Sequence, residues 1–136
     1  MFTYVAIIYT HNNTRIENNI VEQADSLPIA VIETKTGLFF SNNLWTKTPS
    51  SNAAGTGDVI GDPRLVKSGP TGPGLLTSEW FKILANSPAI NKAKVISEVT
   101  EDFFRTGRGL APDIGAYEYA LTDTTSPKPP TGLRIY

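Results

Sequence analysis

Hydrophobic and polar positions along the first third of the chain recur at a fixed offset of 24 residues. Residues 5–8 (VAII) return as residues 29–32 (IAVI), and residues 16–20 (IENNI) return as residues 40–44 (FSNNL). The apolar runs are short and rich in β-branched side chains, without the periodicity of an amphipathic helix. A repeat of this length with strand-like runs is typical of a stacked β-solenoid.

Each repeat predicts two strands that are separated by polar or glycine-containing corners. The first repeat places them at residues 2–10 and 14–22, and the second at residues 29–34 and 38–46. Equivalent positions would lie about 4.8 Å apart, the spacing of neighbouring hydrogen-bonded strands. Similar side chains are then expected to stack in pairs: Ile8 on Ile32, Ile16 on Phe40, and Ile20 on Leu44.

Two pairs of asparagines fall at equivalent positions of the repeat, Asn18-Asn19 and Asn42-Asn43. Stacked amides can hydrogen-bond along the axis of the stack, and asparagine tolerates the left-handed backbone of a sharp bend. The pattern therefore favours a structural role for these side chains at a corner. The alternative is a set of polar groups that grips a ligand.

After Trp45 the repeat stops, and the sequence predicts irregular structure. Residues 46–75 are rich in Gly, Pro, Ser and Asn, which indicates a long loop. Residues 55–58 (GTGD) are followed by neither a Lys-Ser/Thr pair nor a helical pattern, so they fail as a phosphate-binding fingerprint. Residues 61–66 (GDPRLV) predict a turn that leads into a short strand.

The last part of the chain mixes short apolar segments with turns. Residues 80–84 (WFKIL) are compact and apolar, and residues 92–104 predict a short irregular helix or a loop. Residues 113–119 (DIGAYEY) alternate large apolar side chains with small or polar ones, which favours a final strand. We therefore divide the chain into three parts: β-solenoid coils at 1–48, a C-terminal cap at 49–121 and a Pro-rich tail at 122–136.

Composition excludes several classes of function. The 136 residues suffice for one domain, and 12 basic against 13 acidic residues, without a dense basic cluster, argue against a nucleic-acid partner. The absence of Cys excludes disulfides, thiolate metal sites and cysteine nucleophiles. The apolar run from Val5 to Tyr9 is too short to span a membrane, and its flanks are not those of a signal peptide.

Four features, in this order, carry a resemblance to a known family. They are the repeats, GDP at residues 61–63 with Leu65-Val66, SPAI at residues 87–90, and PDIGAYEY at residues 112–119. Over residues 5–119 the chain resembles the C-terminal part of bacterial right-handed parallel β-helix proteins of the pectate-lyase-like superfamily, whose terminal module is called a choice-of-anchor Q domain. The chain departs from the family at residues 91–93, which are Asn-Lys-Ala instead of Asp-Ala-Gly. This change weakens any hydrogen bond or ion contact that the Asp makes in the family.

The resemblance implies an all-β fold with right-handed parallel β-helix coils and an irregular C-terminal cap. It further implies an extracellular or cell-surface protein that is associated with polysaccharides. It transfers no catalytic residue, because no active-site motif of the terminal module maps onto this sequence. A solenoid of about two coils has an open end. We therefore expect this chain to be the C-terminal piece of a longer β-helix, with the upstream coils as its partner, or a truncated reading frame.

Candidate catalytic residues are few. His11, the only histidine, lies before an Asn-Asn corner, and we expect it to be exposed and without a catalytic or metal-binding role. The resemblance to polysaccharide lyases implies a Ca²⁺ held by acidic side chains, with a Lys or Arg as the base. However, Glu17, Glu22 and Glu33 occupy non-equivalent repeat positions, so no acidic ladder forms and we interpret them as surface charges.

Further carboxylates are spread over the cap, namely Asp58, Asp62, Asp113 and Glu118. Asp62 precedes a proline and is interpreted as a turn residue. Asp113 is expected to cap a turn or to pair with Arg105 or Arg108, with a Ca²⁺ site as the alternative. We expect no cofactor and assign no catalytic or metal-binding residue.

Aromatic side chains offer a different function. Tyr4, Tyr9, Trp45 and Trp80 would form a sugar-stacking platform if they faced outward, but the apolar neighbours of both tryptophans favour burial. The leading hypothesis is a non-catalytic structural and capping module of an extracellular, polysaccharide-associated β-helix protein. The alternatives are a fragment of a polysaccharide lyase or glycoside hydrolase whose active coils precede this segment, and a glycan-binding module.

Overall fold

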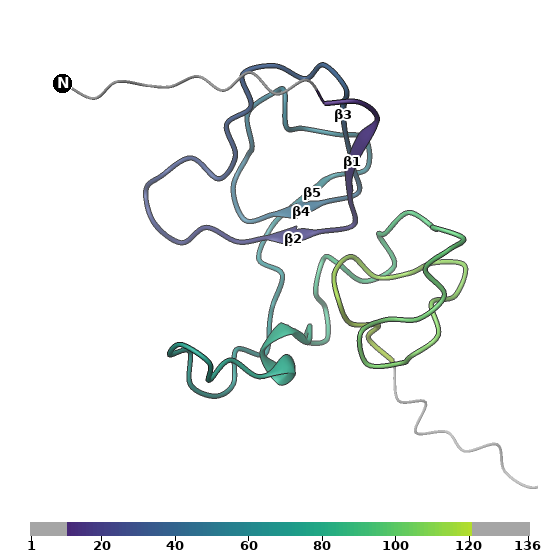
Figure 1. Ribbon diagram of the computed structural model, residues 1–136. Helices are drawn as coiled ribbons and strands as arrows, with labels where there is room; N and C mark the ends of the chain where they lie inside the picture. The colour runs from purple at the N-terminus through teal and green to yellow at the C-terminus, as the bar shows by residue number, and fades with distance from the viewer. Residues whose placement is uncertain (1–10, 121–136) are drawn as a thin grey trace, which may run out of the picture.

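The structure is a computed structural model that describes residues 11–120. These residues contain short strands and one 3-10 helix but no α-helix: β1 (Thr14–Glu17), β2 (Ile20–Val21), β3 (Leu38–Ser41), β4 (Leu44–Trp45), β5 (Val59–Ile60) and η1 (Ser78–Phe81). The all-β class predicted from the sequence is therefore confirmed for the described part of the chain. Figure 1 shows the strands gathered in one half of the molecule, with turns and irregular segments in the other.

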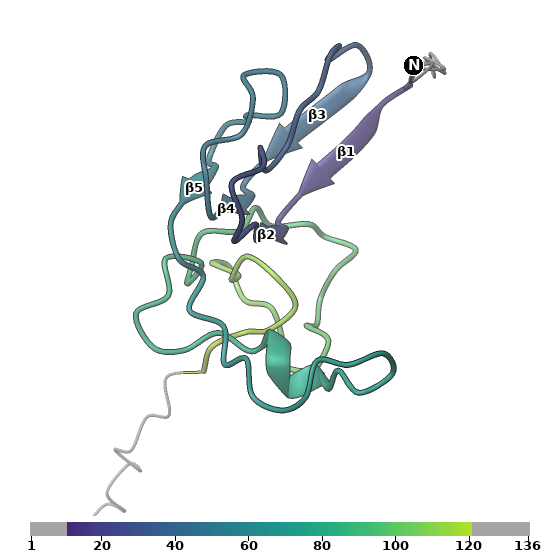
Figure 2. The same cartoon turned by 90° about the vertical axis from the view of Figure 1, so that its left-hand side faces the viewer.

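The strands stack in parallel with the offset that the sequence repeat predicts. β1 pairs with β3, with Ile16 opposite Phe40, and β2 pairs with β4, with Ile20 opposite Leu44. Both stacked pairs were predicted and are confirmed. The third predicted pair includes Ile8, which lies outside the described residues. Figure 2 shows the layers side by side.

A bend divides the strands predicted at residues 14–22 and 38–46 into two short strands each. The bends lie at Asn18 and Asn42, whose φ angles of 60° and 52° are left-handed. Asparagine enters this region more readily than other non-glycine residues because its side chain bonds locally to the backbone. The two bends occupy equivalent positions of the repeat, so β1 and β3 form one wall and β2 and β4 begin the next (Figure 1).

The stack continues beyond Trp45, so the predicted end of the repeat was wrong. β5 pairs in parallel with β4, with Val59 opposite Leu44 and Ile60 opposite Trp45. The coil that leads from β4 to β5 has fewer residues than the sequence repeat, and a comparison of the sequence with itself at one fixed offset therefore misses β5. Residues 46–75 are not one long loop, because β5 lies within them.

The strand predicted at residues 29–34 does not form. Its contacts to the rest of the stack include two hydrogen bonds to Ser50. The Ser50 amide donates to the Ala30 carbonyl at 3.1 Å, and its hydroxyl oxygen accepts from the Ile32 amide at 3.2 Å. Because a side-chain hydroxyl meets Ile32 where a neighbouring strand would offer a carbonyl, no regular ladder develops. Val31, between them, is exposed.

Residues 61–120 lie along the side of the stack, next to its bends (Figures 1 and 2). Leu65 and Ile83 form an antiparallel bridge in this part, with η1 between them in the sequence. The final strand predicted at residues 113–119 is wrong. Three of its backbone amides instead donate to carboxylates, as that of Tyr119 does to Asp113 at 2.6 Å.

The main core lies between the stack and the C-terminal part. It consists of four buried apolar residues that come from both: Leu44, Ile83, Ala89 and Ile114. Partly buried apolar side chains surround them, among them Ile20 and Val59 from the stack and Tyr117 from the C-terminal part. Burial of apolar surface contributes about 25 cal/mol per Å², so this core joins the two parts.

Candidate functional site

The second asparagine of each pair, Asn19 and Asn43, bonds to its counterpart within the stack. The side chain of Asn43 is fully buried. Its Nδ2 donates to the Ile16 carbonyl at 2.8 Å, and its Oδ1 accepts the Asn19 backbone amide at 3.0 Å and Asn19 Nδ2 at 3.1 Å. Both polar atoms of this amide are thus used inside the stack, and the structural interpretation of these residues is confirmed.

The glycine-rich residues 55–58 are also bonded to the stack. The Asp58 carboxylate accepts the Asn43 and Gly55 amides, both at 2.9 Å, and the indole N–H of Trp45 at 2.8 Å. Gly55 lies so close to β3 that a Cβ atom there would be 1.9 Å from the Phe40 carbonyl oxygen. These contacts support a structural role for the loop.

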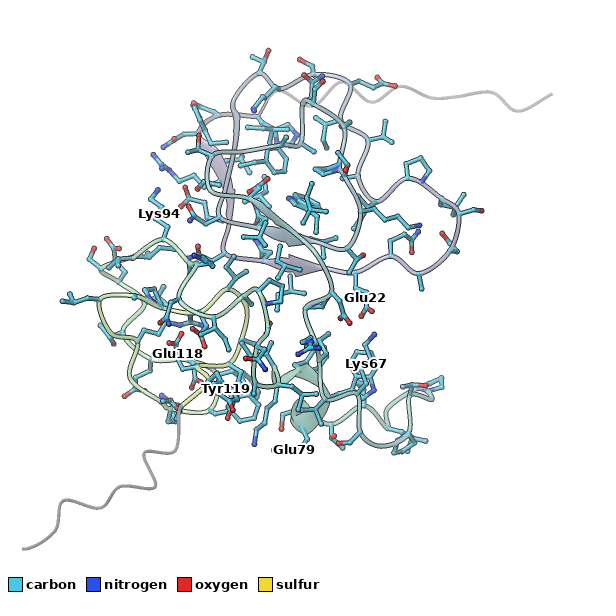
Figure 3. The ribbon with its side chains drawn as sticks, turned by 180° about the vertical axis from the view of Figure 1, so that it is seen from behind. Glu22, Lys67, Glu79, Lys94, Glu118 and Tyr119 are labelled. Carbon is cyan, nitrogen blue, oxygen red and sulfur yellow. The ribbon has the colours of Figure 1, made fainter. Side chains whose placement is uncertain are left out.

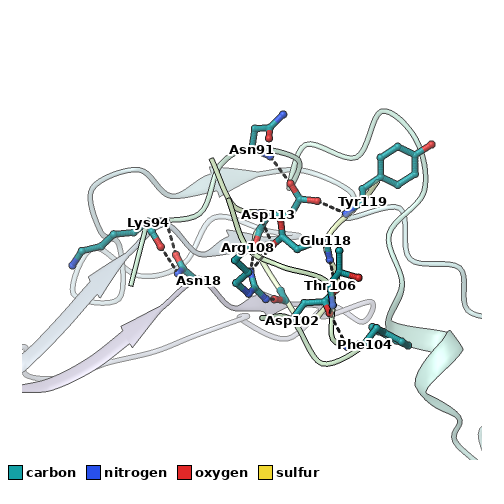
Figure 4. Close-up of polar contacts among 11 residues, drawn as sticks. Asn18, Asn91, Lys94, Asp102, Phe104, Thr106, Arg108, Asp113, Glu118 and Tyr119 are labelled. Carbon is teal, nitrogen blue, oxygen red and sulfur yellow. Dashed lines mark hydrogen bonds and ion pairs between the residues drawn. The ribbon is translucent and has the colours of Figure 1, made fainter. Parts of the chain in front are cut away.

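A joint between Asn18 and Lys94 connects the stack to the C-terminal part. Asn18 Oδ1 accepts the Lys94 amide and Asn18 Nδ2 donates to the Lys94 carbonyl, each at 2.8 Å (Figure 4). This pair of bonds copies the pattern of two neighbouring strands. The Gly115 amide donates to the Asn18 carbonyl at 3.0 Å, and the Lys94 ammonium contacts Glu17 at 2.8 Å.

Arg108 holds together the end of the described chain. Its guanidinium group pairs with the Glu118 carboxylate at 2.7 Å and donates to the carbonyls of Asp113 at 2.8 Å and Gly115 at 2.6 Å (Figure 4). Both charged side chains of the ion pair are largely buried. A buried guanidinium needs such partners because an unpaired charge is costly in a site with little water.

Two further carboxylates of this region accept backbone amides. Asp113 accepts those of Asn91 at 2.7 Å and Tyr119 at 2.6 Å. The pairing of its carboxylate with Arg105 or Arg108 was therefore wrong, since Arg108 contacts only the Asp113 carbonyl. Asp102 accepts the backbone amides of three residues, Phe104, Thr106 and Glu118, at 2.7 to 2.8 Å.

The pKa values of Glu118 and Glu17 are shifted in opposite directions. Burial raises the pKa of Glu118, and the neighbouring Asp113 and Asp102 charges add to this effect, while the Asp113 amide and Arg108 oppose it. Hydrogen bonding to the Lys94 ammonium lowers the pKa of Glu17 against a smaller opposing effect of burial. The contribution of Glu17 to stability is therefore lost as the pH falls, and that of Glu118 is lost as the pH rises.

Two hollows lie where the stack meets the C-terminal part, and Asn18 and Gly115 line both. The first, of about 470 Å³, has a largely apolar wall that includes Val95, Ile96 and Val99. The second, of about 600 Å³, is lined by residues of β2 and η1. Both volumes fall within the range of small-ligand sites.

The other candidate functional residues from the sequence lie apart from one another in the structure. His11 and Glu33 are exposed, as expected. Asp62 forms a turn by accepting the Arg64 amide at 2.8 Å, which confirms its predicted role. Glu22 contacts Lys67. These side chains do not converge on one reaction centre.

Of the four aromatic residues considered as a platform, the structure describes the two tryptophans. Trp45 is buried, as predicted, and its indole bonds to Asp58. Trp80 is partly buried and lines the second hollow. Tyr4 and Tyr9 lie outside the described residues.

Within residues 11–120, no three His, Asp or Glu side chains are placed to hold a metal ion together. The chemistry of the buried acids agrees with this, because Asp102 and Asp113 each direct both carboxylate oxygens at backbone N–H donors. The residues present do not fit the Ca²⁺ that lyases of the resembled fold imply.

The described chain also forms no helix of the length and hydrophobicity that crossing a bilayer requires.

Sequence reasoning missed the roles of Asp102, Arg108 and Lys94. The sequence offers only a weak local signal for Asp102, which accepts the amide two residues ahead as turn-forming Asp residues do. Lys94 and Asn18 bond to each other although they are 76 residues apart in the sequence, and no local pattern predicts such a pair.

We also compared the chain with known families and with curated proteins. No protein-family model matches the chain, and a search of curated proteins finds no significant match.

Proposed function

We propose that this chain is the C-terminal end of a right-handed parallel β-helix, with the irregular residues that follow β5 as a cap of the choice-of-anchor Q type. The parallel pairing of β1 with β3 and of β2 with β4 supports this fold, because both pairs have the same offset. The pairing of β5 with β4 adds a further layer. A β-helix is the arrangement in which every strand pairs with its successor one coil later.

The observation that carries the proposal is the outer edge of β1 and β2. The amides of Thr14 and Asn18 donate to β3 and its flanks, at 2.9 and 3.3 Å. Because parallel ladders use alternate residues, the backbone groups of Arg15 and Glu17 point to the opposite edge. No strand within residues 11–120 pairs with that edge. An edge of this kind is a template for one more strand.

A second feature lies on the same side of the molecule. Asn18 binds the Lys94 carbonyl and Asn42 binds the Lys92 carbonyl, so residues 92–94 run across the layers from the second bend to the first. The chain then continues to Val95 and Val99, and both of these side chains are exposed and line the first hollow. One more layer above β1 would place its bend against these side chains.

The function that follows is structural and non-catalytic. The chain would close the C-terminal end of an extracellular, polysaccharide-associated β-helix protein, and upstream coils would be its partner. The C-terminal part supports the stack through the Asn18 joint and the shared core around Leu44. Fragments of a polysaccharide lyase or a glycoside hydrolase remain the enzymatic alternative, with the active coils upstream.

Hydrogen exchange on the isolated chain, together with sedimentation, tests the open edge. The amides of Arg15 and Glu17 should exchange rapidly, whereas those of Thr14 and Asn18 should be protected. In a longer chain that carries preceding coils, Arg15 and Glu17 should become protected and the melting temperature should rise. A cooperatively melting monomer in which Arg15 and Glu17 are already protected would overturn the proposal.

Two exposed residues supply a matched pair of variants for the longer chain. Val95→Asp should lower its melting temperature, because Val95 would be covered by the added coil. Leu84→Asp changes a similarly exposed side chain, away from the first hollow, and should have little effect. If both changes lowered the melting temperature equally, the first hollow would no longer be evidence for an added coil.

Glycan binding is the second candidate, and one surface feature favours it. Phe39 is 50% exposed on the outer face of β3, and the Arg15 guanidinium lies over its ring at 5.8 Å. Lys35 lies beside them at a shallow hollow that Phe39 also lines. An aromatic face flanked by cations suits an acidic sugar. Uronate oligomers should bind the native chain and not Phe39→Ala, with Phe103→Ala as the exposed aromatic control; equal binding by all three would reject this site.

A further inference from the structure

The side chain of Lys67 lies between a carboxylate and an aromatic ring. Its ammonium contacts the Glu22 carboxylate and sits 5.7 Å from the centroid of the Trp80 ring. Figure 3 shows the Glu22 and Lys67 side chains pointing toward one another. A cation within about 6 Å of an indole face is attracted by the ring, and a carboxylate adds direct charge pairing. The molecule therefore contains a site built for an ammonium group.

The backbone fixes Lys67 at this site. The Lys67 amide donates to the Trp80 carbonyl at 3.3 Å, and the Val66 amide donates to the Lys82 carbonyl at 2.8 Å. Lys67 also has a left-handed φ of 50°, an unfavourable conformation for a residue with a side chain. The two bonds and the bend set the lysine beside the indole ring.

Trp80 and Glu22 are also part of the wall of the second hollow, which measures about 600 Å³. Lys67 is not in that wall and reaches its rim from the neighbouring surface. Among the residues that line the hollow, Glu22 is the only one with a charge; the others are Asn18, Asn19, Ile20, Leu65, Trp80, Phe81, Gly115 and Ala116. A ligand in this hollow would thus meet one negative charge and two aromatic rings.

We propose that this hollow binds a small molecule with an alkylammonium group, and that Lys67 occupies the ammonium position when no ligand is bound. The single carboxylate selects a cation over an anion, and the Trp80 face favours a cation with methyl groups that lose little hydration on binding. The site does not rest on the structural role proposed above, because its three groups (Glu22, Lys67 and Trp80) are not part of the edge of β1.

Lys67 then acts as a tethered competitor. A group attached to the same chain has an effective local concentration on the order of millimolar, so a free ligand must displace it. The affinity of the native chain for an ammonium ligand should be reduced accordingly. Removal of the Lys67 charge, with the length of the side chain kept, should expose the Glu22 carboxylate and the indole face.

Choline and its uncharged analogue of the same shape, 3,3-dimethylbutan-1-ol, provide the test. Titration calorimetry should show that Lys67→Met binds choline at least about tenfold more tightly than the native chain. The neutral analogue should bind neither protein measurably. Adding Glu22→Gln or Trp80→Leu to Lys67→Met should each reduce choline affinity by about tenfold, given the strength of charge pairing and of cation–π contact.

Each variant is first checked for a cooperative thermal melt, and Lys67→Gln replaces Lys67→Met if the latter fails to fold. The proposal is overturned if choline binds the native chain and the Lys67 variant equally, if neither binds it, or if the neutral analogue binds as well as choline. Phosphatidylcholine vesicles separate the two sources of this head group. Binding of free choline alone supports a soluble ligand, and binding of vesicles in addition supports a lipid head group.

Discussion

The amides that converge on Asp102 make it a sensitive position in the C-terminal part. Asp102 is 6% exposed and accepts the amides of Phe104, Thr106 and Glu118 at 2.7 to 2.8 Å. Hydrogen bonds to a charged group are worth about 1.5 to 3 kcal/mol each, and partial hydration of the freed amides puts Asp102→Ala near the lower figure. The expected loss in the free energy of unfolding is therefore about 4.5 kcal/mol for the three bonds together.

Urea unfolding followed by tryptophan fluorescence measures this loss. Small proteins have slopes of about 1 to 3 kcal/mol per molar urea, so the midpoint should fall by about 2 M. Glu101→Ala is the matched control, because Glu101 is the preceding residue and its only ion pair is with the exposed Arg105, at 3.4 Å within the described chain. Exposed ion pairs contribute about 0 to 1 kcal/mol, so the control should shift the midpoint little.

The reasoning fails if Asp102→Ala loses less than about 1 kcal/mol, the value of one ordinary neutral hydrogen bond. It also fails if the loss equals that of Glu101→Ala. Either outcome would mean that the three amides find water or other acceptors, and that the carboxylate does not organise residues 102–118. An unchanged slope is required for the comparison, since a changed slope indicates a different degree of unfolding.

Three other predictions test the core, the glycine contact and the raised pKa. Leu44→Ala, at a fully buried position, should cost about 2 to 5 kcal/mol in urea unfolding. Gly55→Ala should lower the melting temperature because its Cβ would clash with the Phe40 carbonyl, whereas Gly107→Ala, where nothing lies within 4 Å of the added Cβ, should not. Burial raises the pKa of Glu118 above its ordinary value of 4.5, so the contribution of this group to stability is fully present below pH 4.5 and is lost as the pH rises through the raised pKa. Glu118→Gln should flatten urea midpoints across this range, and an unchanged pH profile would contradict the assignment.

The stacked strands could be predicted because their register depends on local sequence. Ile16 with Phe40 and Ile20 with Leu44 meet at the repeat offset, since a parallel strand that slipped by one residue would turn its apolar side chains to the other face. The corner at Asn18 could also be predicted, because asparagine tolerates a left-handed backbone and supplies a polar side chain.

The C-terminal part could not be predicted in the same way. The alternation at residues 113–119 indicates a strand only if its polar side chains face water, but Asp113 is buried and bonds to Asn91 and Tyr119. Buried acids that bind amides produce the same alternating pattern as a half-exposed strand. The joint of Asn18 with Lys94 depends on the complete fold, and the Lys67 contact to Trp80 and Glu22 likewise joins distant segments.

The joint also explains why the stack and the C-terminal part depend on each other. Asn18 and Asn42 belong to successive layers and bind carbonyls two residues apart, at Lys94 and Lys92. Two extended residues span up to about 6.6 Å, which is enough to cross the spacing of about 4.8 Å between layers. Residues 92–94 therefore cross one layer of the stack for every two residues and meet the bend of each layer. By the same spacing, an upstream layer would meet residue 96, beside the exposed Val95, at the edge of β1 with which no strand of residues 11–120 pairs. One additional parallel coil would cover both features at once, whereas a partner that paired only with the edge would leave the apolar wall of the first hollow in water.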